Sequence, residues 1–283
     1  MKSVFVNQGK KEGSAGKIQA RTEEAANFEN GAKLMQLASG MLFGKPADKE
    51  GAVVLAGMAK ERFLKVSKSA SARGASFDAA VAIYDAAGAT AILSDNFEEE
   101  LELLDAAVKK LKEAVPKVES GEIEVGVFES VVKNVNTHLY IHFIMPDEEQ
   151  AQRIVGLMLE CNEMLSPLAE QTDDYLEQVA LIGTRGLLRV YASGGGNEDK
   201  LAGIHADVVN GFKDLAKKLE QNGGAEEAKL ASALRNEILQ DFNQTFRLLR
   251  SSPTGRADLK DVKKWLGQSD DPNDPRKGLP IHG

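Results

Sequence analysis

Two of the four histidines stand at a spacing that suits metal binding. His138 and His142 are four residues apart, which on a helix places both imidazoles on one face, a geometry that zinc sites use. Further ligands are needed, and Glu160, Glu163 or His205 could supply them only if folding brought them close. The metalloprotease motif requires a glutamate directly after the first histidine, and no glutamate stands between these two. The pair is therefore a candidate metal site. The favoured interpretation is instead that both histidines are half-buried polar residues on an apolar helix without a metal.

The other residue types with reactive potential favour structural roles. His205 falls within an apolar stripe, which is typical of a hydrogen-bonded core histidine. Cys161 is the single cysteine, so neither an intramolecular disulfide nor a multi-cysteine zinc site can form, and its apolar helical setting predicts a packed thiol. The glycines at 194–196 lack the Lys-Ser/Thr pair of a phosphate-binding loop and favour a flexible connection. We therefore predict no catalytic residue and no cofactor, and we leave enzymatic activity as an open question that leans towards none.

A local run of cations could contact phosphates. It consists of Lys60, Arg62, Lys65, Lys68 and Arg73. Only one aromatic residue accompanies it, so stacking of bases has little support. A solvated or intramolecularly paired face is the favoured interpretation, and nucleic-acid binding remains the alternative.

Charge is unevenly distributed along the chain. The formal net charge is −8 over 283 residues. Residues 1–73 hold 13 Lys/Arg and 7 Asp/Glu, a net of +6, and residues 74–283 hold 22 and 36, a net of −14. The asymmetry indicates either an acidic partner or a basic third that packs beside the acidic remainder, and we favour the second interpretation.

The clearest helix is expected over residues 94–117. Its apolar positions recur at steps of four and three, the spacing of a sustained seam on one helix face. The seam includes Phe97, Leu101, Leu104, Val108 and Leu111. Such a seam serves helix–helix association, within the chain or between subunits, and packing within the chain is favoured. Pro116 is expected to end this helix.

Helical spacing recurs along most of the chain. Further helices are expected over residues 17–43, 48–72, 76–93, 122–143, 147–165, 172–190, 197–222 and 225–250, and a short strand near 139–143 is kept as an alternative. Eight or nine helices over roughly 70% of the chain predict an all-α, multi-helix bundle, which could be elongated.

The expected organisation is a helical bundle between two looser ends. We expect a mobile arm at 1–16, the bundle at 17–250, and at 251–283 a short helix followed by an extended tail. A sub-boundary near Pro146 or near 194–196 is one alternative, and a single elongated helical assembly is the other. The chain lacks a secretory-type N-terminus and an uncharged apolar run of 18 residues, so a cytoplasmic protein without a membrane span is expected, with signal-independent secretion left open.

Coherent helices without a coherent reactive cluster favour a non-enzymatic function. We expect a helical scaffold, adaptor or assembly subunit that binds a protein partner or self-associates through helix faces. The residues of the 94–117 seam and of the basic run are the expected contact surfaces. The alternatives are a nucleic-acid-associated helical protein that uses residues 60–73, and a helical enzyme or metal-binding protein with a site near His138 and His142.

Overall fold

The predicted all-α class is confirmed over the part of the chain that the structure describes. The structure, a computed structural model, describes residues 15–44, 46–93, 97–144, 148–171, 174–193, 198–222, 224–240 and 242–243. Within these ranges there are nine α-helices, one π-helical turn and no strand. The helices are α1 Ala15–Phe43, α2 Lys49–Ala72, α3 Ser76–Leu93, α4 Phe97–Glu119, α5 Val125–Ile144, α6 Glu148–Ala169, α7 Tyr175–Ala192, α8 Glu198–Asn222 and α9 Ala225–Ala233, with the π-helical turn at Leu234–Ile238. The predicted tail at 251–283 and all of the predicted arm except residues 15 and 16 lie outside these ranges.

Three local predictions are wrong in ways that the backbone explains. Pro116 and Pro167 do not end their helices, since α4 continues to Glu119 and α6 to Ala169. Each proline stands in the last turn, where losing one N–H donor interrupts little of the remaining helix. The helix expected over 172–190 begins at Tyr175 instead, and Asp174 is its N-cap, whose carboxylate accepts a hydrogen bond from the Glu177 N–H at 3.0 Å.

The chain divides into two compact units. The first unit comprises Met1–Val131 and the second Val132–Gly283, so the division falls inside α5. That segment is one continuous helix, which favours our helical interpretation of 122–143 over the strand. Boundaries near Pro146 or 194–196 stay predictions, because those positions lie outside the described residues.

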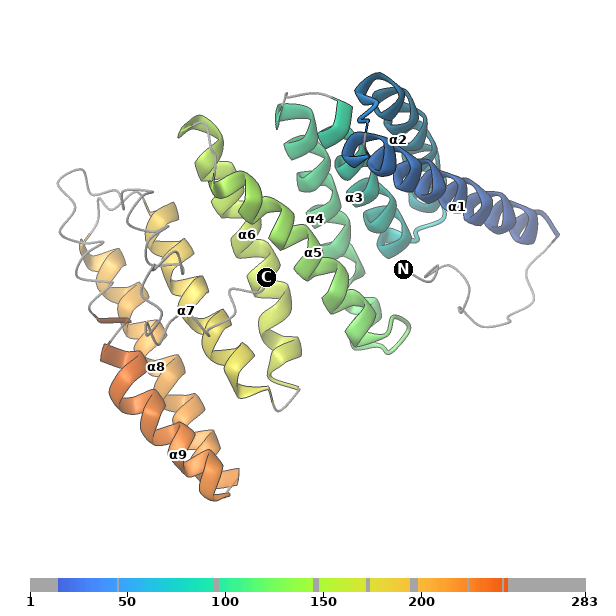
Figure 1. Ribbon diagram of the computed structural model, residues 1–283. Coiled ribbons are helices and arrows are strands. Elements are labelled where there is room, and N and C mark those ends of the chain that lie inside the picture. Colours follow the sequence, from blue (N-terminus) through green and yellow to red (C-terminus); the bar gives the residue numbers. More distant parts are fainter. Residues whose placement is uncertain are drawn as a thin grey trace. The chain divides into compact units, whose positions relative to one another are not determined.

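In the first unit, α1 to α4 pack in chain order, each helix mainly against the next (Figure 1). Small residues make these contacts, with Ala38, Ala52 and Ala56 fully buried together. A Cβ atom on Gly31 would stand 2.7 Å from the Phe63 ring, so glycine allows α1 and α2 to approach closely. Burial of small side chains explains why the apolar stripes of this region look weak in the sequence.

In the second unit, α6 to α9 also follow chain order. The apolar stripe predicted for residues 197–222 is buried at Leu201, Ile204, Val208, Phe212, Leu215 and Leu219. Buried amides link α6 to α7, because Asn162 Nδ2 donates to the Leu181 carbonyl at 3.2 Å and Gln178 Nε2 donates to the Ala169 carbonyl at 3.0 Å. Apolar packing and satisfied polar groups therefore stabilise this unit together.

Among the described helices, α3 alone is long and apolar enough to cross a membrane. Its 18-residue window has a mean hydropathy of 1.2, and 56% of that window is buried inside the protein. It also contains Asp78 and Asp85 and packs on both α2 and α4. These features are those of a core helix, which passes the same test of length and composition.

Candidate functional site

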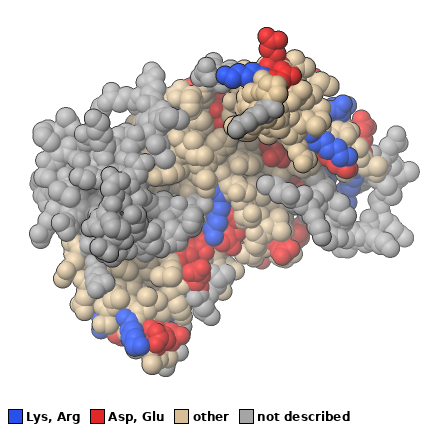
Figure 2. Space-filling view, viewed as in Figure 1, with Lys and Arg blue, Asp and Glu red and all other residues tan. Residues whose placement is uncertain are grey.

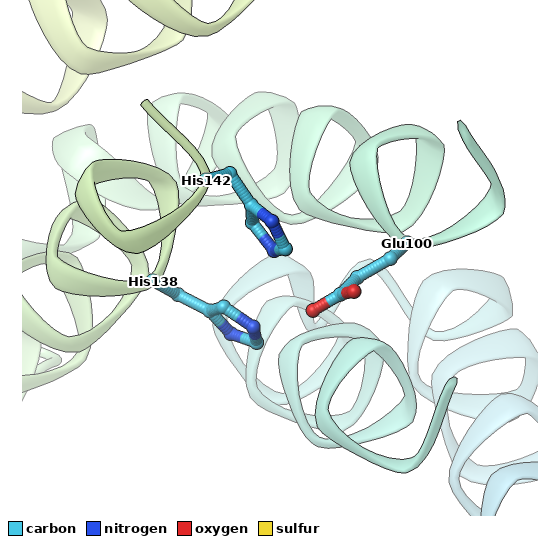
Figure 3. Close-up of side chains that lie close together, drawn as sticks. All are labelled: Glu100, His138 and His142. Carbon is cyan, nitrogen blue, oxygen red and sulfur yellow. The ribbon is translucent and has the colours of Figure 1, made fainter. Parts of the chain in front are cut away.

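The two histidines of the predicted metal pair lie on one face of α5, in the second unit (Figure 3). Their rings stack with centroids 5.1 Å apart and planes inclined by 18°. His142 is 6% exposed and His138 is half-buried. One potential ligand atom on each ring lies within 4.8 Å of the other. The expected i, i+4 geometry is therefore present.

The additional ligands considered from the sequence are not brought to the pair. Among the described residues of the second unit, neither Glu160, Glu163 nor His205 joins the two histidines within that 4.8 Å spacing. His205 instead shares a hydrogen bond of 2.5 Å between its Nε2 and the Asn243 side-chain oxygen, as expected for a structural histidine. Figure 3 also labels Glu100, a buried residue of α4 in the first unit. Glu100 lies in the first turn of α4, where a carboxylate suits the positive end of the helix dipole.

Cys161 is a packed thiol, as its sequence setting predicts. The residue is fully buried in α6. Burial raises the pKa of the thiol, and the neighbouring Glu160 carboxylate raises it further, so the thiolate that reacts with electrophiles is suppressed.

We expect native Cys161 to react with a thiol reagent at least roughly a thousandfold more slowly than in the urea-unfolded chain, because labelling requires the core to open. The time course of reaction with a chromogenic disulfide measures this ratio. Comparable rates in the two states would contradict the burial. Because Cys161 is the single cysteine of the chain, the whole labelling signal comes from this position.

Three cations of the basic run contact polar side chains of neighbouring helices. The contacts join Lys60 Nζ to Glu99 Oε1 at 2.5 Å, Arg62 Nη1 to Asn27 Oδ1 at 3.2 Å and Lys65 Nζ to Glu23 Oε1 at 3.5 Å. The partners come from α1 and α4 of the same unit. On the face seen in Figure 2, Lys and Arg side chains lie among Asp and Glu side chains. These contacts support the intramolecular interpretation of the basic run.

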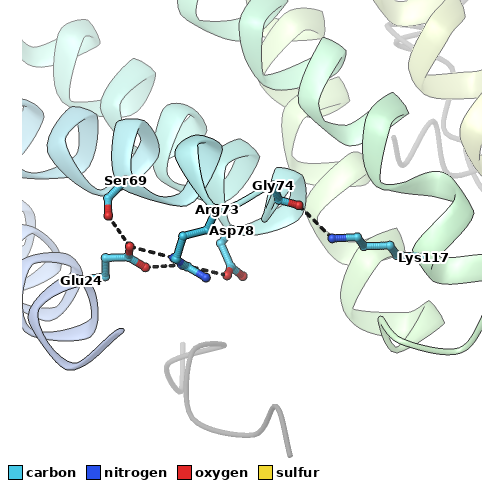
Figure 4. A network of polar contacts seen from close by, with 6 residues as sticks. All are labelled: Glu24, Ser69, Arg73, Gly74, Asp78 and Lys117. Carbon is cyan, nitrogen blue, oxygen red and sulfur yellow. Dashed lines mark hydrogen bonds and ion pairs between the residues drawn. The ribbon is translucent and has the colours of Figure 1, made fainter. Parts of the chain in front are cut away.

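Arg73, the fourth of these cations, lies in a partly buried network (Figure 4). Its Nε donates to Glu24 Oε1 at 3.0 Å, its Nη2 contacts Glu24 Oε2, and the Ser69 hydroxyl also donates to Glu24 Oε1. The Arg73 Nη2 stands 3.8 Å from Asp78 Oδ2. Hydrogen bonding to Glu24 raises the pKa of Arg73, and burial raises the pKa of Asp78 against the opposing effect of Arg73. The network therefore joins α1, α2 and α3.

Most cations of the basic run thus form ion pairs or hydrogen bonds between helices of the first unit. Next to the network, Lys117 Nζ of α4 donates to the Gly74 carbonyl at 2.8 Å (Figure 4). Of the five cations, Lys68 is exposed at the surface without an ion pair to another described residue. Binding of nucleic acid through residues 60–73 stays a prediction.

The α4 seam proposed for association lies inside the protein. Leu101 is 2% exposed, and Leu104, Val108 and Leu111 are fully buried. Phe97, at the start of the helix, is half-buried. This burial favours packing within the chain, the interpretation preferred from the sequence, and leaves little of the seam for a partner.

Large exposed apolar side chains instead gather on the α1–α2 hairpin. Of the eight described residues of this kind, six belong to the hairpin, here termed the hairpin apolar set: Leu37, Phe43, Val53, Val54, Met58 and Leu64. The most exposed are Phe43 at 81% and Val54 at 62%. Single exposed apolar residues are ordinary, whereas exposed apolar residues that form a contiguous patch mark an interaction surface, so this set is a candidate for one. The spacing of apolar residues in the sequence did not reveal it, because these side chains flank the buried small residues.

No protein-family model, curated protein or solved structure matches this chain. The class that the fold defines is an all-α protein whose helices pack in chain order within each unit.

Proposed function

We propose that the protein is a non-enzymatic helical scaffold that binds protein through its α1–α2 hairpin, the occupant being either another protein or a second copy of this chain. The observation that carries this proposal is the hairpin apolar set. A Phe side chain left 81% exposed keeps nearly all of its apolar area in water. Burying such a side chain at an interface contributes about 1.5–3 kcal/mol, which makes it a strong anchor for a partner.

The packing of the first unit supports the proposal that α2 exposes apolar side chains to a binding partner. Helices that follow one another in chain order bury the faces that contact the preceding and following helix, and they leave an outer face open. On α2 the buried positions Ala52, Ala56 and Ala59 define the inner face. Val54 and Met58 are four residues apart and therefore share a face, and their exposures of 62% and 46% place it outside. The apolar surface is thus carried on a rigid helix.

A triple variant, Phe43→Ser, Val54→Lys and Met58→Lys, is expected to lose binding while keeping the fold. Removing three exposed apolar contacts should weaken association at least about a hundredfold, because central apolar anchors contribute about 2 kcal/mol or more each. Light scattering on the purified chain measures self-association, and quantitative affinity capture measures retention of another protein. Far-UV circular dichroism of the variant should match that of the unchanged chain.

The double variant Gln152→Lys/Gln221→Lys is the matched control, since both residues are exposed on helices α6 and α8 of the second unit and the variant gains the same two positive charges without losing apolar surface. It should leave association unchanged. A chain that remains monomeric and retains no partner, or a triple variant that associates as well as the control, would remove the proposed function.

A further inference from the structure

We propose that His138 and His142 together hold a divalent transition-metal ion, a function separate from protein binding by the hairpin. Both imidazoles project from the same face of α5 with stacked rings, and the centroid separation is 5.1 Å. Ligand atoms of the pair lie within 4.8 Å of each other. Two nitrogens bound to one such ion stand about 3 Å apart, and ring rotations about Cβ–Cγ are soft, so small rotations close the site.

The position of the pair along α5 favours a cation. His142 lies in the last turn of the helix and His138 one turn earlier. The negative end of the helix dipole lies there, and a positive ion is stabilised by about 0.3–1 kcal/mol at such an end.

The donor type selects the class of ion. Imidazole nitrogens suit Zn²⁺, Cu²⁺ and Ni²⁺, whereas Ca²⁺ and Mg²⁺ prefer oxygen ligands. Burial of His142, which is 6% exposed, shields one side of the site, while the half-buried His138 leaves an approach from solvent. With two imidazoles bound, the remaining coordination positions of the ion go to water or to an exchangeable ligand, one position more than in open zinc sites, where the protein supplies three ligands.

Calorimetric titration of the full chain with ZnCl₂ tests the proposal, using protein purified without a histidine tag and stripped with a chelator. We expect one ion per chain and a dissociation constant at least about tenfold weaker in His138→Gln, because even loss of an outer-shell partner typically weakens binding about 10- to 100-fold. His138 is the position of choice because it is half-buried and its replacement disturbs the core less than that of His142. Acidification should release the ion, since protonated imidazole cannot coordinate.

The control is His205→Gln, which removes another half-buried histidine whose ring is hydrogen-bonded to Asn243. It should leave zinc affinity unchanged. A second readout uses Cu²⁺ as the probe, since its electron paramagnetic resonance spectrum reports coupled nitrogens. Two imidazole nitrogens are expected in the unchanged chain and one in His138→Gln. No stoichiometric zinc binding, or equal affinity in His138→Gln and the unchanged chain, would overturn the proposal, and the result for the triple hairpin variant is independent of it.

Discussion

Replacing Arg73 with alanine is expected to lower the free energy of unfolding by about 1–3 kcal/mol, because it leaves the buried Glu24 carboxylate short of a partner while the guanidinium that is lost was itself partly in contact with water. Glu24 is 4% exposed and receives two contacts from the Arg73 guanidinium. Without Arg73, its carboxylate would remain largely buried, with the Ser69 hydroxyl as its remaining partner in the network. Urea unfolding followed by far-UV circular dichroism measures the change.

Two controls separate burial from charge. Lys33→Met breaks the exposed Glu29–Lys33 pair, whose side chains are 65% and 64% exposed, and should change stability by less than about 1 kcal/mol. The double variant Glu24→Met/Arg73→Met removes both charges, so it should recover most of the loss. An Arg73→Ala variant as stable as Lys33→Met would show that the network contributes little to the fold.

Replacing Asp85 with asparagine is expected to stabilise the protein at pH 8 by about 2–4 kcal/mol. Burial within α3 raises the pKa of Asp85 to about 7 from an ordinary value of 3.8. Each unit of such a shift corresponds to about 1.4 kcal/mol, so ionising this carboxyl inside the folded protein is strongly unfavourable. Asparagine has nearly the same shape and carries no charge, which removes that penalty.

The sign of the pH dependence follows from proton binding. Between about pH 4 and pH 7 the folded protein keeps the Asp85 proton that the unfolded chain has lost, so this residue makes stability fall as pH rises through that window. Asp85→Asn should reduce that fall, which urea titrations at pH 5 and pH 8 would measure. Glu102→Gln, which removes an exposed carboxylate from α4, is the control and should leave the slope unchanged. If the change of unfolding free energy with pH were the same in Asp85→Asn as in the unchanged chain, the pKa of Asp85 in the folded protein would be near its ordinary value and the prediction would be wrong.

Local signals in the sequence predicted the helices well. For residues 94–117, the apolar seam, the acidic first turn and the basic end all agreed, and α4 covers Phe97–Glu119. The expected helix over 48–72 corresponds to α2 within one residue at its start, and Asp48 caps it by accepting from the Gly51 N–H at 2.8 Å. The helices continue past Pro116 and Pro167 by three and two residues, because a proline removes one N–H donor and crowds the carbonyl four residues earlier, and this cost did not stop the backbone within the same turn.

The candidate sites were harder to predict, because they depend on contacts between distant residues. The i, i+4 spacing of His138 and His142 was visible, since it arises within one helix. The pairing of Glu24 with Arg73 joins residues 49 apart, and no periodicity reports it. The raised pKa of Asp85 and the exposure of Phe43 depend on which helix faces meet, and the small side chains of α1 to α3 left those faces ambiguous.

Site-specific photocrosslinking in the native host tests the proposed protein-binding role most directly. A photoreactive phenylalanine analogue at position 43 would stand where the side chain is 81% exposed on the hairpin. We predict a discrete covalent adduct with another protein or with a second copy of this chain, and no such adduct from the same analogue at Gln152, an exposed residue of α6 in the second unit. Equal, unspecific labelling at both positions, or none at either, would contradict the account.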